Sequence, residues 1–161
     1  MSDGGWPADW SERKAGRGCP MCASLGSQVD DDHGVFVCEM PSTEVRLQRR
    51  SRLPGYCVVA WRHGHVAEAT ELEADAATRY WSDVLAVSSA IDGEFTPMKM
   101  NLLTLGNWVP HLHTHVVPRY VDDPAPGQPL PWRDMFDDSP GVDANLHDVA
   151  SKLRARLGTL S

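Results

Sequence analysis

The 161-residue sequence lacks any apolar run near the roughly 20 residues that a membrane-spanning helix needs. Residues 1–7 lack the basic and apolar regions of a secretory signal peptide. Basic residues are fewer than acidic ones, so the formal net charge is -7. Such a charge disfavours a protein that grips duplex nucleic acid by its phosphate backbone. We therefore expect a cytoplasmic protein whose partners include neither a membrane nor duplex nucleic acid.

The composition is otherwise that of a soluble globular protein, with 42% hydrophobic and 23% charged residues. The length suggests one domain with a sizeable core. Residues 1–18 are rich in glycine and read as an irregular N-terminal arm. Residues 19–120 contain the regular patterns and form the expected domain. Residues 121–161 combine a proline-rich segment with a helix that we expect to pack on the same domain.

Alternating or continuous apolar residues, bounded by turn residues, predict strands. We expect them at residues 34–38, around 45–47, at 56–61, at 99–105, and from 111 until Pro118, which should end the last strand because proline cannot donate to a central ladder.

Two amphipathic helices complete the pattern. Thr70 and Glu73 form a capping box that predicts the start of the first, and Gly93 should end it. Its apolar positions recur every three or four residues, at Leu72, Ala76, Tyr80, Val84, Val87 and Ile91. The second helix carries Leu146, Val149, Leu153 and Leu157. This order predicts an α+β fold, with an antiparallel sheet, a long amphipathic helix and a C-terminal helix.

The most informative stretch is the sequence His-Leu-His-Thr-His-Val-Val at residues 111–117. Alternate residues of a strand share one face, so the three imidazoles should form a row about 7 Å apart. Three interpretations are open. The row could be an ordinary surface strand, a three-histidine metal site, or a nucleophilic site in which one imidazole attacks and its neighbours orient it.

Four cysteines are present, and two of them form a Cys-x-x-Cys motif, Cys19 and Cys22. In a reducing compartment this pair is a better candidate for a metal site than for a structural disulfide. Zinc would need two further ligands, for which His63, His65 and His111 are candidates. The alternative is a pair of unligated thiols. Cys38 and Cys57 lie in strand-like segments and should be free, buried thiols.

The histidine motif followed by Pro118 and Arg119 resembles the histidine triad (HIT) family. The similarity extends over about residues 19–120 and includes the segments 54–59 and 99–107. It implies the same α+β fold, usually as a two-fold homodimer. It also implies that His113, the middle histidine, is the nucleophile. Its neighbour His115 would hydrogen-bond the phosphate or protonate the leaving group.

The resemblance also suggests which residues bind the substrate. Asn101 and Asn107 occupy positions at which related proteins contact phosphate, although either could be a simple turn residue. Trp108 replaces the small hydroxyl residue that relatives carry. Gln48 matches a polar position near the ribose, and arginines at 46, 49, 50 and 52 would add local positive charge. The alternative for Gln48 is a solvated strand edge.

Several HIT proteins build a structural zinc site from a Cys-x-x-Cys, a histidine after the central strand, and the first triad histidine. Here the resemblance implies Cys19, Cys22, His65 and His111, with His63 as the alternative to His65. A closed four-ligand site would tie the N-terminal segment to the sheet.

The favoured function is therefore a HIT-type nucleotide hydrolase or nucleotidyltransferase. It would cleave a purine nucleoside phosphoramidate or dinucleoside polyphosphate at the α-phosphate through a nucleotidylated His113. An alternative is a nucleotide-binding, zinc-stabilised interaction module with little turnover. A third is a metal-dependent hydrolase that uses all three histidines.

Overall fold

The computed structural model describes residues 5–32, 34–129, 131–138 and 143–159. Residues 1–4 of the N-terminal arm therefore lie outside the described residues. The elements, in chain order, are α1 (Trp10–Lys14), α2 (Pro20–Ser24), β1 (Gly34–Glu39), β2 (Thr43–Gln48), β3 (Cys57–Trp61), α3 (Ala74–Phe95), β4 (Lys99–Leu103), β5 (His113–Arg119) and α4 (Leu146–Gly158).

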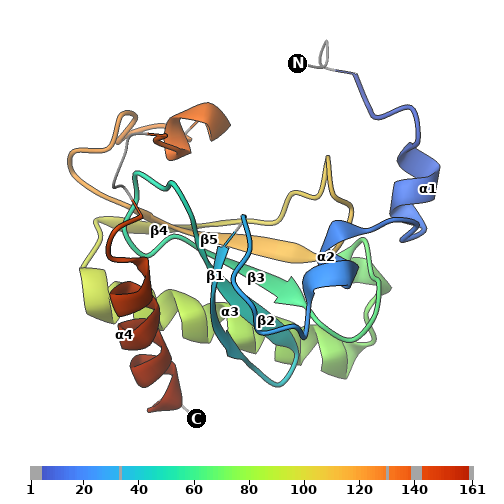
Figure 1. Cartoon of the computed structure of the whole chain (residues 1–161), viewed down its shortest axis with the longest axis horizontal. Coiled ribbons are helices and arrows are strands. Elements are labelled where there is room, and N and C mark those ends of the chain that lie inside the picture. Colours follow the sequence, from blue (N-terminus) through green and yellow to red (C-terminus); the bar gives the residue numbers. More distant parts are fainter. Residues whose placement is uncertain (1–4, 33, 130, 139–142, 160–161) are drawn as a thin grey trace.

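The strands form one antiparallel sheet in the order β1-β2-β3-β5-β4. The helices α3 and α4 lie on one side of it, and the proline-rich segment, drawn in orange, lies on the other (Figure 1). We call this second side the histidine face, because it carries His113 and His115. The α+β prediction, with its long and C-terminal helices, is confirmed.

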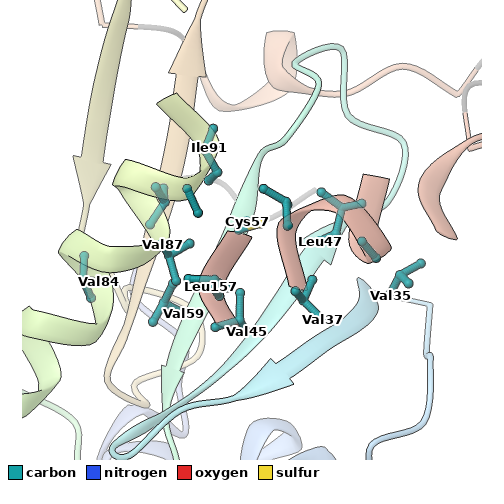
Figure 2. Close-up of a cluster of buried hydrophobic side chains, with 14 of the residues drawn as sticks. Val35, Val37, Val45, Leu47, Cys57, Val59, Val84, Val87, Ile91 and Leu157 are labelled. Carbon is teal, nitrogen blue, oxygen red and sulfur yellow. The ribbon is translucent and has the colours of Figure 1, made fainter. Parts of the chain in front are cut away.

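The main core lies between the sheet and the two helices. Valine and leucine side chains of β1, β2 and β3 meet Val84, Val87 and Ile91 of α3 and Leu157 of α4 (Figure 2). Burial of these apolar side chains is the main contribution to the stability of the fold. Both remaining cysteines are free thiols as predicted, but only Cys57 is buried in this core, whereas Cys38 packs against it and is half-buried.

The expected capping box at Thr70 and Glu73 is wrong. Residues 69–71 form a single 3-10 turn, and Leu72 and Glu73 are extended, so α3 begins at Ala74. The prediction of its end is also wrong, because Gly93 lies inside the helix. Chain reversal occurs at Thr96, which adopts a left-handed conformation with φ of 46°.

The strand β5 continues through Pro118, contrary to the prediction. Its pairing with β3 extends only from His113 to Val116, whereas its pairing with β4 includes Pro118 and Arg119. At Pro118 the strand thus has a neighbour on one side only, which is where a sheet tolerates proline.

The proline-rich segment is ordered against the histidine face. Met135 and Phe136 pack with Tyr56 and Val117 in a second, smaller apolar cluster. The Ser51–Phe136 bridge ties the segment to the turn after β2. No helix in the described part of the chain has both the length and the hydropathy to cross a membrane.

Candidate functional site

Strand alternation divides β5 between the two sides of the sheet. Val116 belongs to the core beneath the helices, whereas Val117 packs with Met135 on the histidine face. His113 and His115 share the side of Val117, because strand side chains repeat every two residues. Their ring centroids lie 4.9 Å apart, closer than the spacing of alternate residues, with the planes at 79°.

The orientation of His113 is fixed by the main chain. Its Nδ1 lies 2.6 Å from the carbonyl oxygen of His111. A carbonyl oxygen only accepts hydrogen bonds, so we assign the ring proton to Nδ1. The Nε2 atom then carries a lone pair. Burial lowers the pKa of His113, which favours the neutral, nucleophilic imidazole.

His115 is held by a tyrosine that the sequence did not single out. The Tyr56 hydroxyl lies 2.8 Å from His115 Nδ1, and both side chains are buried. A hydroxyl can donate or accept, so it suits either protonation state of the ring. Burial, followed by the effect of His113, lowers the pKa of His115 to about 3. The contact with Tyr56 occupies Nδ1, which makes Nε2 the candidate nitrogen for proton transfer.

Thr114, the polar residue between the two histidines, faces the opposite side. Its hydroxyl lies 2.7 Å from the Tyr80 hydroxyl of α3 and 2.7 Å from the Thr104 hydroxyl. These bonds satisfy a buried polar group that replaces the usual apolar residue. The bond to Tyr80 also connects β5 to α3.

His111 does not continue the row of histidines. It precedes β5, and its ring packs 5.4 Å from that of His65. His111 Nε2 lies 2.8 Å from the carbonyl oxygen of Trp61, so we assign the ring proton to Nε2. Its Nδ1 faces the thiols of Cys19 and Cys22 at 3.5 and 3.4 Å.

His65 is oriented in the same way. Its Nε2 lies 3.1 Å from the carbonyl oxygen of Lys14 and its Nδ1 lies 3.5 Å from Cys22 Sγ. The ligand atoms of Cys19, Cys22, His65 and His111 all lie within 4.8 Å of one another. His63 is directed elsewhere, with Nε2 2.8 Å from the carbonyl oxygen of Pro41.

This Cys2His2 cluster has the chemistry of a zinc site. Burial and the neighbouring Cys19 raise the pKa of the Cys22 thiol to about 11, so a Cys22 thiolate needs a bound cation to be stable. Each imidazole has its distal nitrogen bonded to a main-chain carbonyl, as metal-binding histidines commonly do. The donor set therefore fits zinc, with no fifth position required.

The three residues expected to bind substrate occupy different places. Asn101 lies on β4 opposite Val117, and its Oδ1 accepts a hydrogen bond of 2.9 Å from Arg119. Gln48 ends β2, and its main-chain N–H donates to the carbonyl oxygen of Tyr56. Asn107 is exposed in the loop before β5. Their roles in substrate binding remain predictions.

The arginines near Gln48 do not form a free positive patch. Arg46 pairs with Glu44 and Asp31, and Arg49 lies within 3.8 Å of Asp30 and Asp143. Arg50 and Arg52 likewise bond to Asp138 and to the carbonyl oxygen of Phe136. The expected local positive charge is thus largely neutralised.

The N-terminal arm reaches the loop before the triad. The Arg13 guanidinium lies 4.9 Å from the centre of the Trp108 ring and donates to the Trp108 carbonyl oxygen at 3.2 Å. The unusual Trp108 is therefore a docking point for α1. Sequence reasoning missed this contact, as it missed Tyr56, because both depend on residues far apart in the chain.

Known proteins resemble this chain in sequence and in fold. A sequence model of the HIT domain matches residues 30–122, which is more than half of the chain. The protein Hit of Bacillus subtilis is 29% identical over 100 residues, a match that spans 59% of this chain. It spans 66% of that protein, slightly less than two thirds of its length.

Solved structures agree. A histidine triad protein from Marinobacter aquaeolei superposes with a TM-score of 0.68 at 27% identity, covering 80% of this chain and 92% of that one. A zinc-bound histidine triad family protein from Mycobacterium smegmatis gives a TM-score of 0.61 at 20% identity, covering 88% and 94%. The second likeness supports the fold alone. Together with the domain match, the arrangement of His111, His113 and His115 establishes that the chain belongs to the HIT family.

Proposed function

We propose that the protein is a nucleotide hydrolase or nucleotidyltransferase that forms a covalent intermediate on His113. The observation that carries this proposal is the bond from His113 Nδ1 to the His111 carbonyl oxygen. It leaves the Nε2 lone pair available and fixes its direction. His115 lies beside it and its Nδ1 is oriented by Tyr56, so its ring is placed for proton transfer.

In the first step His113 Nε2 attacks the α-phosphorus, and the bond from phosphorus to the leaving group breaks. The anionic phosphate favours the imidazolium form of His115, which then donates its Nε2 proton to the leaving group. When His115 is an imidazolium, the Tyr56 oxygen accepts from Nδ1–H. When His115 is neutral, the hydroxyl donates to Nδ1 instead.

In the second step water attacks the nucleotidylated His113. Neutral His115 takes a proton from this water, and His113 departs as neutral imidazole, so both residues return to their starting states. A second nucleophile in place of water would make the same intermediate a nucleotidyltransferase. No metal ion takes part in either step.

We propose a purine nucleoside phosphoramidate or dinucleoside polyphosphate as substrate. Gln48 on the histidine face would contact the ribose. Asn107, in the loop before β5, would donate to phosphate oxygens. Asn101, which the resemblance places near the phosphates, would donate to an oxyanion of the substrate. The family resemblance supports this substrate class.

Turnover assays with adenylyl and guanylyl phosphoramidates and dinucleoside polyphosphates test this proposal. Release of the mononucleotide without added metal supports it. Tight nucleotide binding without turnover would instead favour the nucleotide-binding interaction module. Activity that is lost to a chelator and restored by metal would favour the metal-dependent hydrolase.

Zinc is proposed as a structural cofactor held by Cys19, Cys22, His65 and His111. When bound, it would join α2 and its N-terminal residue Cys19, the loop after β3 and the segment before β5. Such a closed site stabilises the fold and does not activate water. Its effect on catalysis is to hold the His111 main chain, whose carbonyl oxygen orients His113.

A homodimer is proposed as the functional state. Strand β4 is an edge of the sheet, and its Leu102 is 38% exposed. On α3, Trp81 and Leu85 are 38% and 58% exposed although each is a large apolar side chain. Unpaired edges and exposed apolar side chains are commonly covered in an assembly.

A further inference from the structure

A pocket of about 610 Å³ lies on the histidine face, farther along β5 than His115. Side chains of β4 and β5 form its floor, and residues 126–129 with Met135 form its outer wall. Leu103 of β4 lines the pocket and pairs directly with His115. The pocket therefore begins next to the imidazole that would protonate the leaving group.

The polarity of this pocket changes with distance from His115. Its near part contains Leu103, Leu105 and Val117. Its far part contains the register pair Lys99 and Arg119. Four residues along a strand separate His115 from Arg119, which corresponds to about 13 Å. A ligand that fills the pocket would therefore meet an apolar surface first and polar groups last.

Arg119 builds the pocket and has no donor left for a ligand. Its five N–H groups bond to both carboxylate oxygens of Asp123, to Asn101 Oδ1, and to the carbonyl oxygens of Ala125 and Gln128. These bonds fasten the proline-rich wall to the sheet. They also turn the Asn101 oxygen toward the guanidinium, so Asn101 Nδ2 remains as a donor.

Lys99 supplies the free charge of the far part. It is exposed, and within the described residues it has no hydrogen-bond or ion-pair partner. Lys152 is the lysine that does pair, with Glu94 on the helix side. An ammonium and an amide N–H are donors only. Lys99 and Asn101 Nδ2 together therefore suit an oxyanion, such as a carboxylate or a phosphate.

The attack by His113 determines which part of the substrate enters this pocket. In an in-line displacement, the leaving group departs on the side of phosphorus opposite to the nucleophile. His115, its proton donor, lies two residues along β5 from His113, in the direction of the pocket. The leaving group would thus pass His115 and enter between Leu103 and Val117.

We infer that this pocket binds the leaving group of the substrate, and that the leaving group is an amine with an apolar body and an oxyanion at its far end. The inference rests on the proposed function and favours a phosphoramidate. A polyphosphate would place its charges against the apolar part of the pocket. In the reaction the P–N bond breaks, the bond from phosphorus to His113 Nε2 forms, and the nitrogen leaves with its electron pair and the proton of His115.

A series of adenosine 5′-phosphoramidates with one alkyl chain length tests the inference. The chain ends in a methyl, a carboxylate, a phosphonate or an ammonium group, and a dinucleoside polyphosphate is added for comparison. We expect kcat/KM to be highest for the two anionic ends and lowest for the ammonium end. A difference between carboxylate and phosphonate identifies which oxyanion fits better.

The variants Lys99→Met and Lys99→Glu show whether the preference arises in the pocket. Lys99→Met should lower the ratio of kcat/KM for the carboxylate end to that for the methyl end by up to about fivefold, as expected for an exposed ion pair. Lys99→Glu should reverse the order in favour of the ammonium end. Lys152→Met, which removes a lysine from the helix side, should keep the wild-type ratio.

Turnover that is independent of the chain end, or fastest for the polyphosphate, would overturn the inference while leaving the hydrolase in place. Absence of turnover on every substrate would overturn the proposed function. Calorimetry with the free carboxylate-ended amine then tests separately whether the pocket binds this leaving group. Binding that weakens in Lys99→Met supports the pocket, and equal or undetectable binding refutes it.

Discussion

The Nδ1 atom of His113 lies 2.6 Å from the main-chain carbonyl oxygen of His111, whose own imidazole faces Cys19 and Cys22. One residue thus orients the proposed nucleophile with its main chain and joins the cysteine cluster with its side chain. Under the proposed function the first two histidines of the motif have separate roles, so substitutions at the two positions should have different effects.

His113→Asn should fold and still bind a mononucleotide, because Asn107, Gln48 and His115 remain. It should lose hydrolysis by several orders of magnitude, since asparagine cannot replace the covalent route. His111→Asn keeps the main-chain carbonyl, so its main losses should be zinc and stability. Turnover, zinc content and melting temperature, measured together on both variants, check this. If the two variants lost metal and activity alike, a catalytic three-histidine metal site would be the better account.

Removal of the two thiols tests the zinc site. The double variant Cys19→Ala, Cys22→Ala should contain no zinc and melt at a lower temperature, whereas wild type should contain about one zinc per chain. Cys38→Ala, which removes a thiol that is not part of the cluster, should keep its zinc. Metal analysis and thermal unfolding are the measurements. Wild-type protein without metal, together with unchanged melting of the double variant, would rule out the site.

Tyr56→Phe tests the contact between the tyrosine hydroxyl and His115. The ring should keep its packing against Phe136, so the fold should persist. Without the hydroxyl His115 is poorly oriented, and kcat should fall by up to about a hundredfold, within the range that general acid–base catalysis contributes. The loss should be larger for poorer leaving groups. Tyr120→Phe, which removes a hydroxyl bonded to the Pro54 carbonyl oxygen, is the matched control. Equal kinetics in the two variants would show that Tyr56 has no positioning role.

The pH dependence of stability should reflect the buried His115. Its pKa of about 3 in the folded protein lies far below the ~6.5 of an unfolded chain. Between these values the unfolded state binds a proton that the folded state excludes, so the free energy of unfolding falls as pH falls. His115→Asn should reduce this slope by up to about 1.4 kcal/mol per pH unit. Urea unfolding of both proteins between about pH 7 and pH 5 measures the slopes, and identical slopes would contradict the assignment.

Light scattering tests the proposed dimer. Wild type should have twice the chain mass at micromolar concentration, and Leu85→Glu should move the mass toward that of the monomer, because a charge in an apolar interface is costly. Val121→Glu is a suitable control, since Val121 is also exposed but lies outside α3 and β4. A clean monomer mass for wild type would exclude the dimer.

Local patterns in the sequence predicted what depends on neighbouring residues. Alternation placed His113 and His115 on one face and Thr114 on the other, because the strand period is the same wherever the strand lies in the sheet. The same reasoning failed for His111, since alternation holds only inside a strand and β5 begins at His113. The capping box failed because a 3-10 turn at residues 69–71 takes the place of the first helical turn.

Contacts between segments far apart in the chain could not be predicted from local sequence patterns. The bond between Tyr56 and His115 depends on the register of β3 against β5, which local patterns do not determine. The four prolines of residues 122–131 predicted no regular element, and residues 122–129 and 131 contain no helix or strand. The docking of this proline-rich segment, however, depends on the buried pair of Arg119 and Asp123, which closes a wall against β4 and β5. The pocket therefore had no signature in the sequence.

A mass-spectrometric trap of the covalent intermediate tests the central claim most directly. Protein mixed with a phosphoramidate is quenched in denaturant at alkaline pH and digested. We predict that the wild-type peptide containing His113 gains the mass of one nucleotidyl group, and that His115→Asn retains the adduct longer because hydrolysis is slowed. The peptide from His113→Asn should gain nothing. Turnover by wild type with no adduct on His113 at any quench time, or an adduct on another residue, would contradict the account.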